Sequence, residues 1–134
     1  MTTVIAFDLN ETLLDLSALD EPFERLFGAA PLRPQWFATM LQLSFVGGLT
    51  GDYVDFSTAQ RAALTMLAER HGVDLPAAAA EDVVGRMSSL PPHPEVAGGL
   101  ATLTDTSLRI VALTNSVADA ARFSATSLAC NNTW

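Results

Sequence analysis

The sequence predicts an α/β fold in which two short parallel strands are separated by a long helical insertion. Apolar runs at residues 4–7 and 109–113 are rich in β-branched residues, which favours strands. Neither run alternates with polar residues, so we expect strands that are covered on both faces. The stretch between them has the apolar spacing of amphipathic helices. A mostly helical protein, with both runs as buried helix pieces, remains an alternative.

Capping residues, glycines and prolines bound six predicted helices. Four fill the insertion, and they run from Ser17 to Gly28, from Pro34 to Gly47-Gly48, from Ser57 to Gly72 and over 77–90, where Pro91-Pro92 follows. Ser57 and Gln60 form a capping-box pattern. A fifth helix over 94–104 and a sixth over 117–128 flank the second strand. We therefore expect a core over 1–15, a helical cap over 16–90 above the first strand tip, and further core over 91–134.

The charge of the chain excludes several classes of partner. With 15 acidic residues, seven arginines, no lysine and a net charge of -8, the chain would be repelled by nucleic acid. No apolar run reaches the length of a membrane span, so no membrane partner is expected. The single cysteine, Cys130, allows no internal disulfide, and no secretory leader is visible, which predicts a cytoplasmic protein.

Polar residues follow both predicted strands at the edge where open α/β sheets bind ligands. Asp8 follows the first strand, and Thr114 and Asn115 follow the second. An aspartate is ionised at pH 7 even when burial raises its pKa by about two units, so Asp8 could act as a nucleophile without an activating base. The hydroxyl of Thr12 is placed to orient it. The alternative is that Asp8 only caps a turn.

Three segments carry a resemblance to a known family. Phe7-Asp8-Leu9-Asn10-Glu11-Thr12-Leu13-Leu14-Asp15 resembles the first motif of the haloacid dehalogenase (HAD) superfamily, an Asp at a strand tip followed four residues later by Thr. Leu113-Thr114-Asn115-Ser116 is similar to the second motif. Gly51-Asp52-Tyr53-Val54-Asp55-Phe56 resembles a cap segment of the L-2-haloacid dehalogenase branch. The resemblance implies a partial Rossmann-like core with an inserted four-helix cap, truncated at its C-terminus before the third and fourth motifs.

Asn10 distinguishes between the branches of the superfamily. Phosphatases of the family carry a second Asp two residues after the nucleophile, where it acts as general acid/base and helps to hold magnesium. An amide neither transfers a proton at pH 7 nor adds charge to a metal site. The resemblance therefore implies a hydrolase without metal or cofactor, in which Asp8 displaces halide from a small 2-haloacid through an aspartyl ester. A HAD-like phosphatase is an alternative.

The resemblance also implies substrate-binding positions. Thr114 and Asn115 would bind the nucleophile or the substrate carboxylate. Trp36, Tyr53 and Phe56 could line an apolar pocket, although aromatic residues suit a core equally well. Phe37 occupies the position at which the L-2-haloacid dehalogenase branch has an Arg that binds the substrate.

Further departures from the family pattern favour an alternative in which the chain has no catalytic activity. Arg33 lies four residues before Phe37 at the helix entrance, and no Lys exists to serve the third motif. A catalytically silent fragment that oligomerises or binds a partner is therefore a second alternative. A two-stranded sheet with an unpaired edge is marginal by itself, which predicts a homodimer or higher oligomer.

Overall fold

The computed structural model describes residues 3–28, 32–104 and 106–114. The α/β architecture with inserted helices is confirmed. The predicted sixth helix over 117–128 lies outside the described residues. The elements in chain order are β1 (Val4–Phe7), a 3-10 helix (Leu16–Leu19), α1 (Asp20–Phe27), α2 (Leu32–Thr50), α3 (Phe56–His71), α4 (Ala77–Arg86), a second 3-10 helix (Met87–Ser89), α5 (Val96–Thr104) and β2 (Arg109–Ala112).

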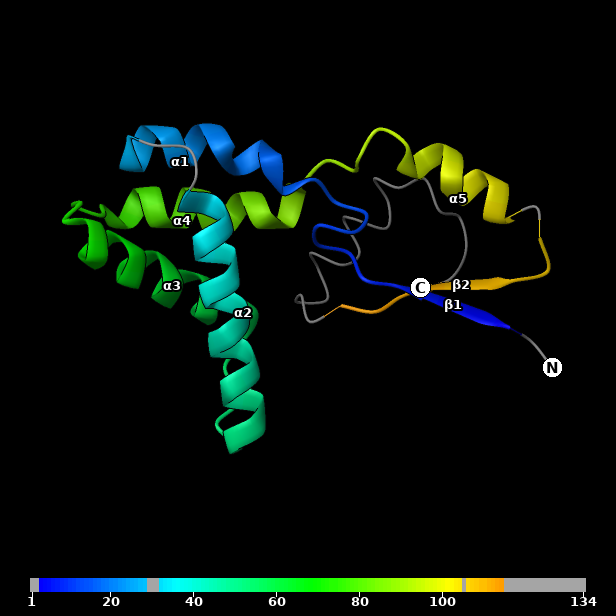
Figure 1. The fold of residues 1–134 in the computed structure, drawn as a ribbon, viewed down its shortest axis with the longest axis horizontal. Helices are drawn as coiled ribbons and strands as arrows, with labels where there is room; N and C mark the ends of the chain where they lie inside the picture. Colours follow the sequence, from blue (N-terminus) through cyan, green and yellow to red (C-terminus); the bar gives the residue numbers. More distant parts are fainter. Residues whose placement is uncertain (1–2, 29–31, 105, 115–134) are drawn as a thin grey trace. The chain divides into compact units, whose positions relative to one another are not determined.

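The two strands form a parallel pair, as predicted (Figure 1). Val4 lies opposite Arg109 and Phe7 opposite Ala112, and the N–H of Leu113 donates to the carbonyl of Phe7 at 2.8 Å. The expectation of strands covered on both faces is wrong for the described chain, because no residue of either strand is buried. The composition of a strand shows what it could bury, whereas burial itself depends on the elements that pack on it.

The chain divides into two compact units, one comprising Met1–Ala18 with Met87–Trp134 and the other Leu19–Arg86. We call the first the strand unit and the second the helical unit. Within the strand unit, Leu14 forms an antiparallel bridge with Pro92. The N–H of Asp15 donates to the Pro91 carbonyl at 2.8 Å, and the N–H of His93 to the Leu13 carbonyl at 3.0 Å. The segments that lead into and out of the helical unit are thus hydrogen-bonded to each other.

The helical unit has its own core around Trp36. The Trp36 side chain is fully buried, and its indole Nε1–H donates to the main-chain carbonyl of Gln60 at 3.1 Å. Its ring centroid lies 5.3 Å from that of Phe23. Helices α1, α2 and α3 are therefore joined through one side chain. No described helix is long and apolar enough to cross a membrane.

Two predicted N-caps differ from the observed ones. Ser17 does not cap α1; its N–H donates to the Asp15 carboxylate at 2.8 Å, and α1 begins after Leu19 without a side-chain cap. The cap of α3 is Asp55 and not Ser57, although a helix does begin there. Both helices end as predicted, at Gly28 and Gly72 in the left-handed conformation that glycine adopts without strain.

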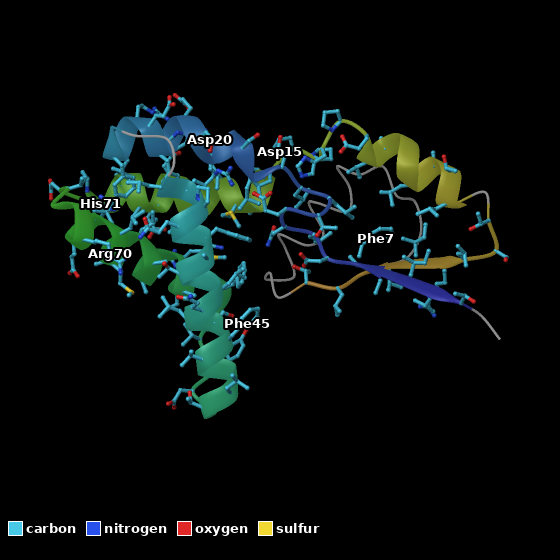
Figure 2. The ribbon with its side chains drawn as sticks, in the orientation of Figure 1. Phe7, Asp15, Asp20, Phe45, Arg70 and His71 are labelled. Atoms are coloured by element: carbon cyan, nitrogen blue, oxygen red, sulfur yellow. The ribbon has the colours of Figure 1, made fainter. Side chains whose placement is uncertain are left out.

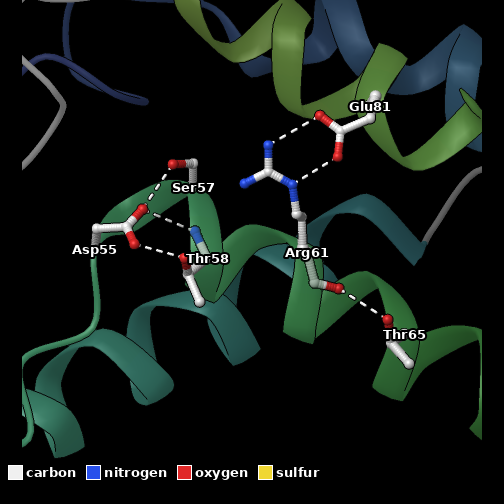
Figure 3. A network of polar contacts seen from close by, with 6 residues as sticks. All are labelled: Asp55, Ser57, Thr58, Arg61, Thr65 and Glu81. Atoms are coloured by element: carbon white, nitrogen blue, oxygen red, sulfur yellow. Dashed lines mark hydrogen bonds and ion pairs between the residues drawn. The ribbon is translucent and has the colours of Figure 1, made fainter. Parts of the chain in front are cut away.

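Asp55 accepts three kinds of hydrogen bond at the start of α3 (Figure 3). The Ser57 hydroxyl donates to it at 2.6 Å, and Thr58 donates through its N–H at 3.0 Å and through its hydroxyl. These bonds, with Ser57 contributing most, hold the pKa of Asp55 well below its usual range. Further along α3, Arg61 donates to both carboxylate oxygens of Glu81 at 2.7 and 2.9 Å, which ties α3 to α4.

Helix α2 is longer than predicted at both ends. It begins at Leu32, before Pro34, and continues through Gly47 and Gly48 to Thr50. Gly47 is buried because the chain returns against it: a Cβ at this position would lie 2.6 Å from the carbonyl oxygen of Asp52 and 3.2 Å from the Val54 side chain. Gly47 therefore serves packing and does not end the helix. The fourth helix is instead shorter than predicted, with its last turn in the 3-10 form.

The two neighbouring glycines of α2 should respond oppositely to alanine. We expect Gly47→Ala to lower the free energy of unfolding by about 1–3 kcal/mol, since the new methyl group clashes with fixed main chain. Gly48 has no atom within 4 Å of such a methyl group, so Gly48→Ala should raise stability by about 0.5–1 kcal/mol through helix propensity. Urea unfolding followed by circular dichroism measures both. Equal shifts of one sign would contradict the assigned packing.

Candidate functional site

The loop after β1 is held in shape by its own main chain. The N–H groups of Leu13 and Leu14 both donate to the Leu9 carbonyl at 2.9 Å, and the N–H of Glu11 donates to the Leu14 carbonyl at 3.0 Å. Glu11 has φ of 64°, a left-handed conformation that is unusual for a residue with a side chain. The buried side chains of Leu9 and Leu13 anchor the loop in the strand unit. Asp8, at its start, therefore projects from a fixed frame.

The Asp8 carboxylate is exposed and has one described contact. The Thr12 hydroxyl donates to its Oδ2 across 3.5 Å, at the long end of hydrogen bonding. Among the described residues no cation forms an ion pair with Asp8. The second oxygen of this exposed side chain thus accepts no hydrogen bond from a described residue, which suits the attack of a carboxylate on an external electrophile.

Main-chain donors lie beside this carboxylate in the sequence of the loop. Within the described ranges, no hydrogen bond engages the N–H groups of Leu9, Asn10 or Thr12. Asn10 is half-buried, and its main chain forms an isolated parallel β-bridge with Leu14. A short segment that follows Asp8 therefore offers several unused donors, which suits an anionic group near the nucleophile.

The second strand brings Thr114 to the same edge of the sheet. Because Phe7 and Ala112 are in register in a parallel pair, the residues that follow them leave the sheet on the same side. Asp8 and the half-buried Thr114 are such residues, as the sequence predicts for both strand tips. Asn115 lies outside the described residues, so its predicted role stays a prediction.

The remaining predicted site residues belong to the helical unit. Trp36 is part of its core, and the ring of the half-buried Phe37 lies 6.4 Å from that of Trp36. Tyr53 is 81% exposed. Arg33 pairs with Asp20 at 2.6 Å, with 15% of the Arg33 side chain exposed, so it ties the start of α2 to α1. The substrate-binding roles of Trp36, Phe37 and Tyr53 stay predictions.

Two features of the chain were not predicted from the sequence. The left-handed Glu11 carries no sequence signature, because glycine or asparagine would be the expected residue there. Gln60 is buried, and its side-chain Oε1 accepts no hydrogen bond within the described part of the chain.

The described residues hold no group of three or more His, Cys, Asp or Glu side chains that is placed to bind a metal ion.

Comparison with known proteins gives a consistent assignment. No family model matches the chain. It is similar to haloacetate dehalogenase H-2 of Moraxella sp. (strain B), with 27% identity over 113 residues, which is 83% of this chain. Its fold matches L-2-haloacid dehalogenase from Xanthobacter autotrophicus with a TM-score of 0.84 and 26% identity over 98% of this chain. In sequence and in fold, the chain is therefore similar to haloacid dehalogenases.

Two further solved structures match the fold of the chain. The Xanthobacter enzyme with chloropropionic acid covalently bound matches with a TM-score of 0.79 and 24% identity over 98% of this chain and 54% of that one. Another L-2-haloacid dehalogenase matches with a TM-score of 0.85 and 21% identity, over 94% of this chain and 58% of that one. The chain spans about half the length of its relatives, 50% of the Moraxella enzyme and 54% of the Xanthobacter enzyme.

Proposed function

We propose that this chain is a member of the HAD superfamily and carries the nucleophile-bearing part of a dehalogenase that acts on small 2-haloacids. The observation that carries the proposal is the exposed Asp8 carboxylate at the tip of β1, which contacts Thr12 and has no described cationic partner. The similarity to enzymes whose names specify haloacetate and L-2-haloacids supports the same substrate class.

The proposed reaction has two steps. In the first, an Asp8 carboxylate oxygen attacks C2 of the haloacid, a C–O bond forms, and the halide leaves with the electron pair of the broken C–halogen bond. In the second, water attacks the carbonyl carbon of the aspartyl ester. Cleavage of the acyl C–O bond then restores the Asp8 carboxylate and releases the 2-hydroxyacid, with one proton passing to solvent.

The residues of the loop have distinct proposed roles. Thr12 orients the nucleophile through its hydroxyl, which is already directed to Oδ2. The N–H groups of Leu9, Asn10 and Thr12, which donate to no described residue, are proposed donors to a negatively charged group. Thr114 and Asn115 are proposed to hold the substrate carboxylate or the nucleophile.

A panel of substrates separates the proposal from its alternatives. We expect halide release from 2-chloropropionate and no turnover of p-nitrophenyl phosphate with magnesium. Phosphate release with no halide release would establish a phosphatase-like site despite Asn10. Inactivity towards both, in a cooperatively folded chain, would favour the silent fragment that oligomerises or binds a partner.

Chelation is expected to leave dehalogenation unchanged. Asn10 stands where a second carboxylate would complete a magnesium site, and a carboxylate nucleophile needs no metal-bound water. Halide release should therefore proceed at the same rate before and after treatment with EDTA. Adding magnesium to the treated protein is the matched control. A loss with chelator that magnesium restores would contradict the metal-free mechanism.

A further inference from the structure

The loop after β1 carries a second acidic residue three positions after Asp8. Glu11 is exposed, and its left-handed backbone is held by the hydrogen bond from its N–H to the Leu14 carbonyl at 3.0 Å. Phe7 and Asp15, which Figure 2 labels, mark the two ends of this loop. The Cα atoms of Asp8 and Glu11 lie no more than about 11 Å apart, since three residues span no more when fully extended. A negative charge is therefore held near the proposed nucleophile.

Arginines carry the positive side-chain charge of this chain, which has no lysine and two histidines that count as neutral at pH 7. Four of them form ion pairs with carboxylates inside the helical unit, namely Arg25, Arg33, Arg61 and Arg86. Arg70 lies in the last turn of α3, and Arg122 lies outside the described residues. In the strand unit, Arg109 begins β2 opposite Val4, and Asp8 follows four residues after Val4, about 13 Å further along the sheet at ~3.3 Å per residue. This separation exceeds the Debye length of ~8 Å at physiological ionic strength, so Arg109 offsets little of the charge at Asp8.

This distribution of charge favours an uncharged electrophile over a carboxylate. A substrate carboxylate beside Asp8 would meet the negative charges of both Asp8 and Glu11, and like charges oppose its approach. A 2-haloamide offers the same bond between C2 and the halogen, with a neutral carbamoyl group in place of the carboxylate. Its carbonyl can accept from the N–H groups of Asn10 and Thr12, which donate to no described residue, and its N–H groups can donate to a carboxylate such as that of Glu11.

We propose that this chain also dehalogenates neutral 2-haloamides, and that it prefers them to the corresponding 2-haloacids. The inference rests on the proposed function, because it uses the same nucleophile. An Asp8 carboxylate oxygen attacks C2, a C–O bond forms, and the halide leaves with the electron pair of the broken C–halogen bond. Water then attacks the carbonyl carbon of the aspartyl ester, and cleavage of the acyl C–O bond restores Asp8. The 2-hydroxyamide is released with its amide bond intact, and one proton passes to solvent.

Turnover of 2-chloropropionamide and of 2-chloropropionate by the full chain tests the proposal, with lactamide and lactate measured by chromatography. Each kcat/KM is divided by the rate constant at which acetate displaces chloride from the same compound, which removes differences in intrinsic reactivity. We expect this normalised value to be about fivefold or more higher for the amide. Added sodium sulfate should lower the preference, because salt screens the repulsion of the acid and leaves the neutral amide unaffected.

Glu11→Gln removes the charge and retains the size of the side chain. It should lower the preference for the amide by about threefold, through a higher kcat/KM for the acid. Glu69→Gln removes an equal charge from an exposed position of α3 and, as the matched control, should leave the preference unchanged. An equal or higher normalised kcat/KM for the acid, or a preference that responds neither to salt nor to Glu11→Gln, would overturn this inference alone. Formation of neither lactamide nor lactate would overturn the proposed function as well.

Discussion

Asp8→Asn is expected to reduce halide release by roughly a thousandfold or more, which corresponds to about 4 kcal/mol or more in the reaction barrier. The amide has nearly the shape of the carboxylate but lacks the nucleophilic oxygen that forms the ester. Because Asp8 is exposed and contacts only Thr12 among the described residues, the fold should persist. Initial rates of halide release from 2-chloropropionate, with circular dichroism of the same samples, measure both effects.

A matched control for this substitution is Asp74→Asn, which removes an exposed carboxylate from the loop between α3 and α4. It changes the net charge equally and should leave halide release unchanged. Incubation with 2-chloropropionate should also add the mass of a 1-carboxyethyl group to the unaltered chain and not to Asp8→Asn. Halide release that persists in Asp8→Asn, with an unaltered spectrum, would rule out Asp8 as the nucleophile.

Trp36→Ala is expected to lower the free energy of unfolding of the helical unit by about 3–5 kcal/mol. The substitution opens a cavity where α1, α2 and α3 meet, and it removes the side-chain hydrogen bond to the Gln60 carbonyl. Urea unfolding followed by circular dichroism measures the loss. Trp36→Phe retains most of the ring volume and should cost less. A loss below about 1 kcal/mol for Trp36→Ala would show that this side chain does not hold the unit together.

The parts of the fold that the sequence predicts correctly depend on local chemistry. Gly28 and Gly72 end their helices because glycine adopts positive φ without strain, whatever packs nearby. The two strands follow from β-branched runs that end in polar residues. The cap of α3 was misassigned because Asp55 and Ser57 both carry oxygen acceptors, and only the geometry shows which of them receives the Thr58 N–H.

Features that depend on distant contacts were not predictable in this way. Gly47 and Gly48 look like a helix end, yet the helix continues because the segment from Asp52 to Val54 packs on Gly47. At the candidate site, the Asp8 and Thr12 positions follow from a short motif with fixed spacing. The indole of Trp36 donates to a residue 24 positions away, so no local pattern could identify that bond.

The bridge between Leu14 and Pro92 has a consequence for how the inserted segment can change in evolution. Because the segments before and after the insertion are hydrogen-bonded to each other, the residues between them form a closed loop. Its closure entropy grows only with the logarithm of its length, by roughly 0.6 kcal/mol for each doubling. Lengthening, shortening or exchanging this closed loop would leave the pairing of β1 with β2 unaltered. A bridge of this kind allows the same nucleophile loop to be combined with many different insertions.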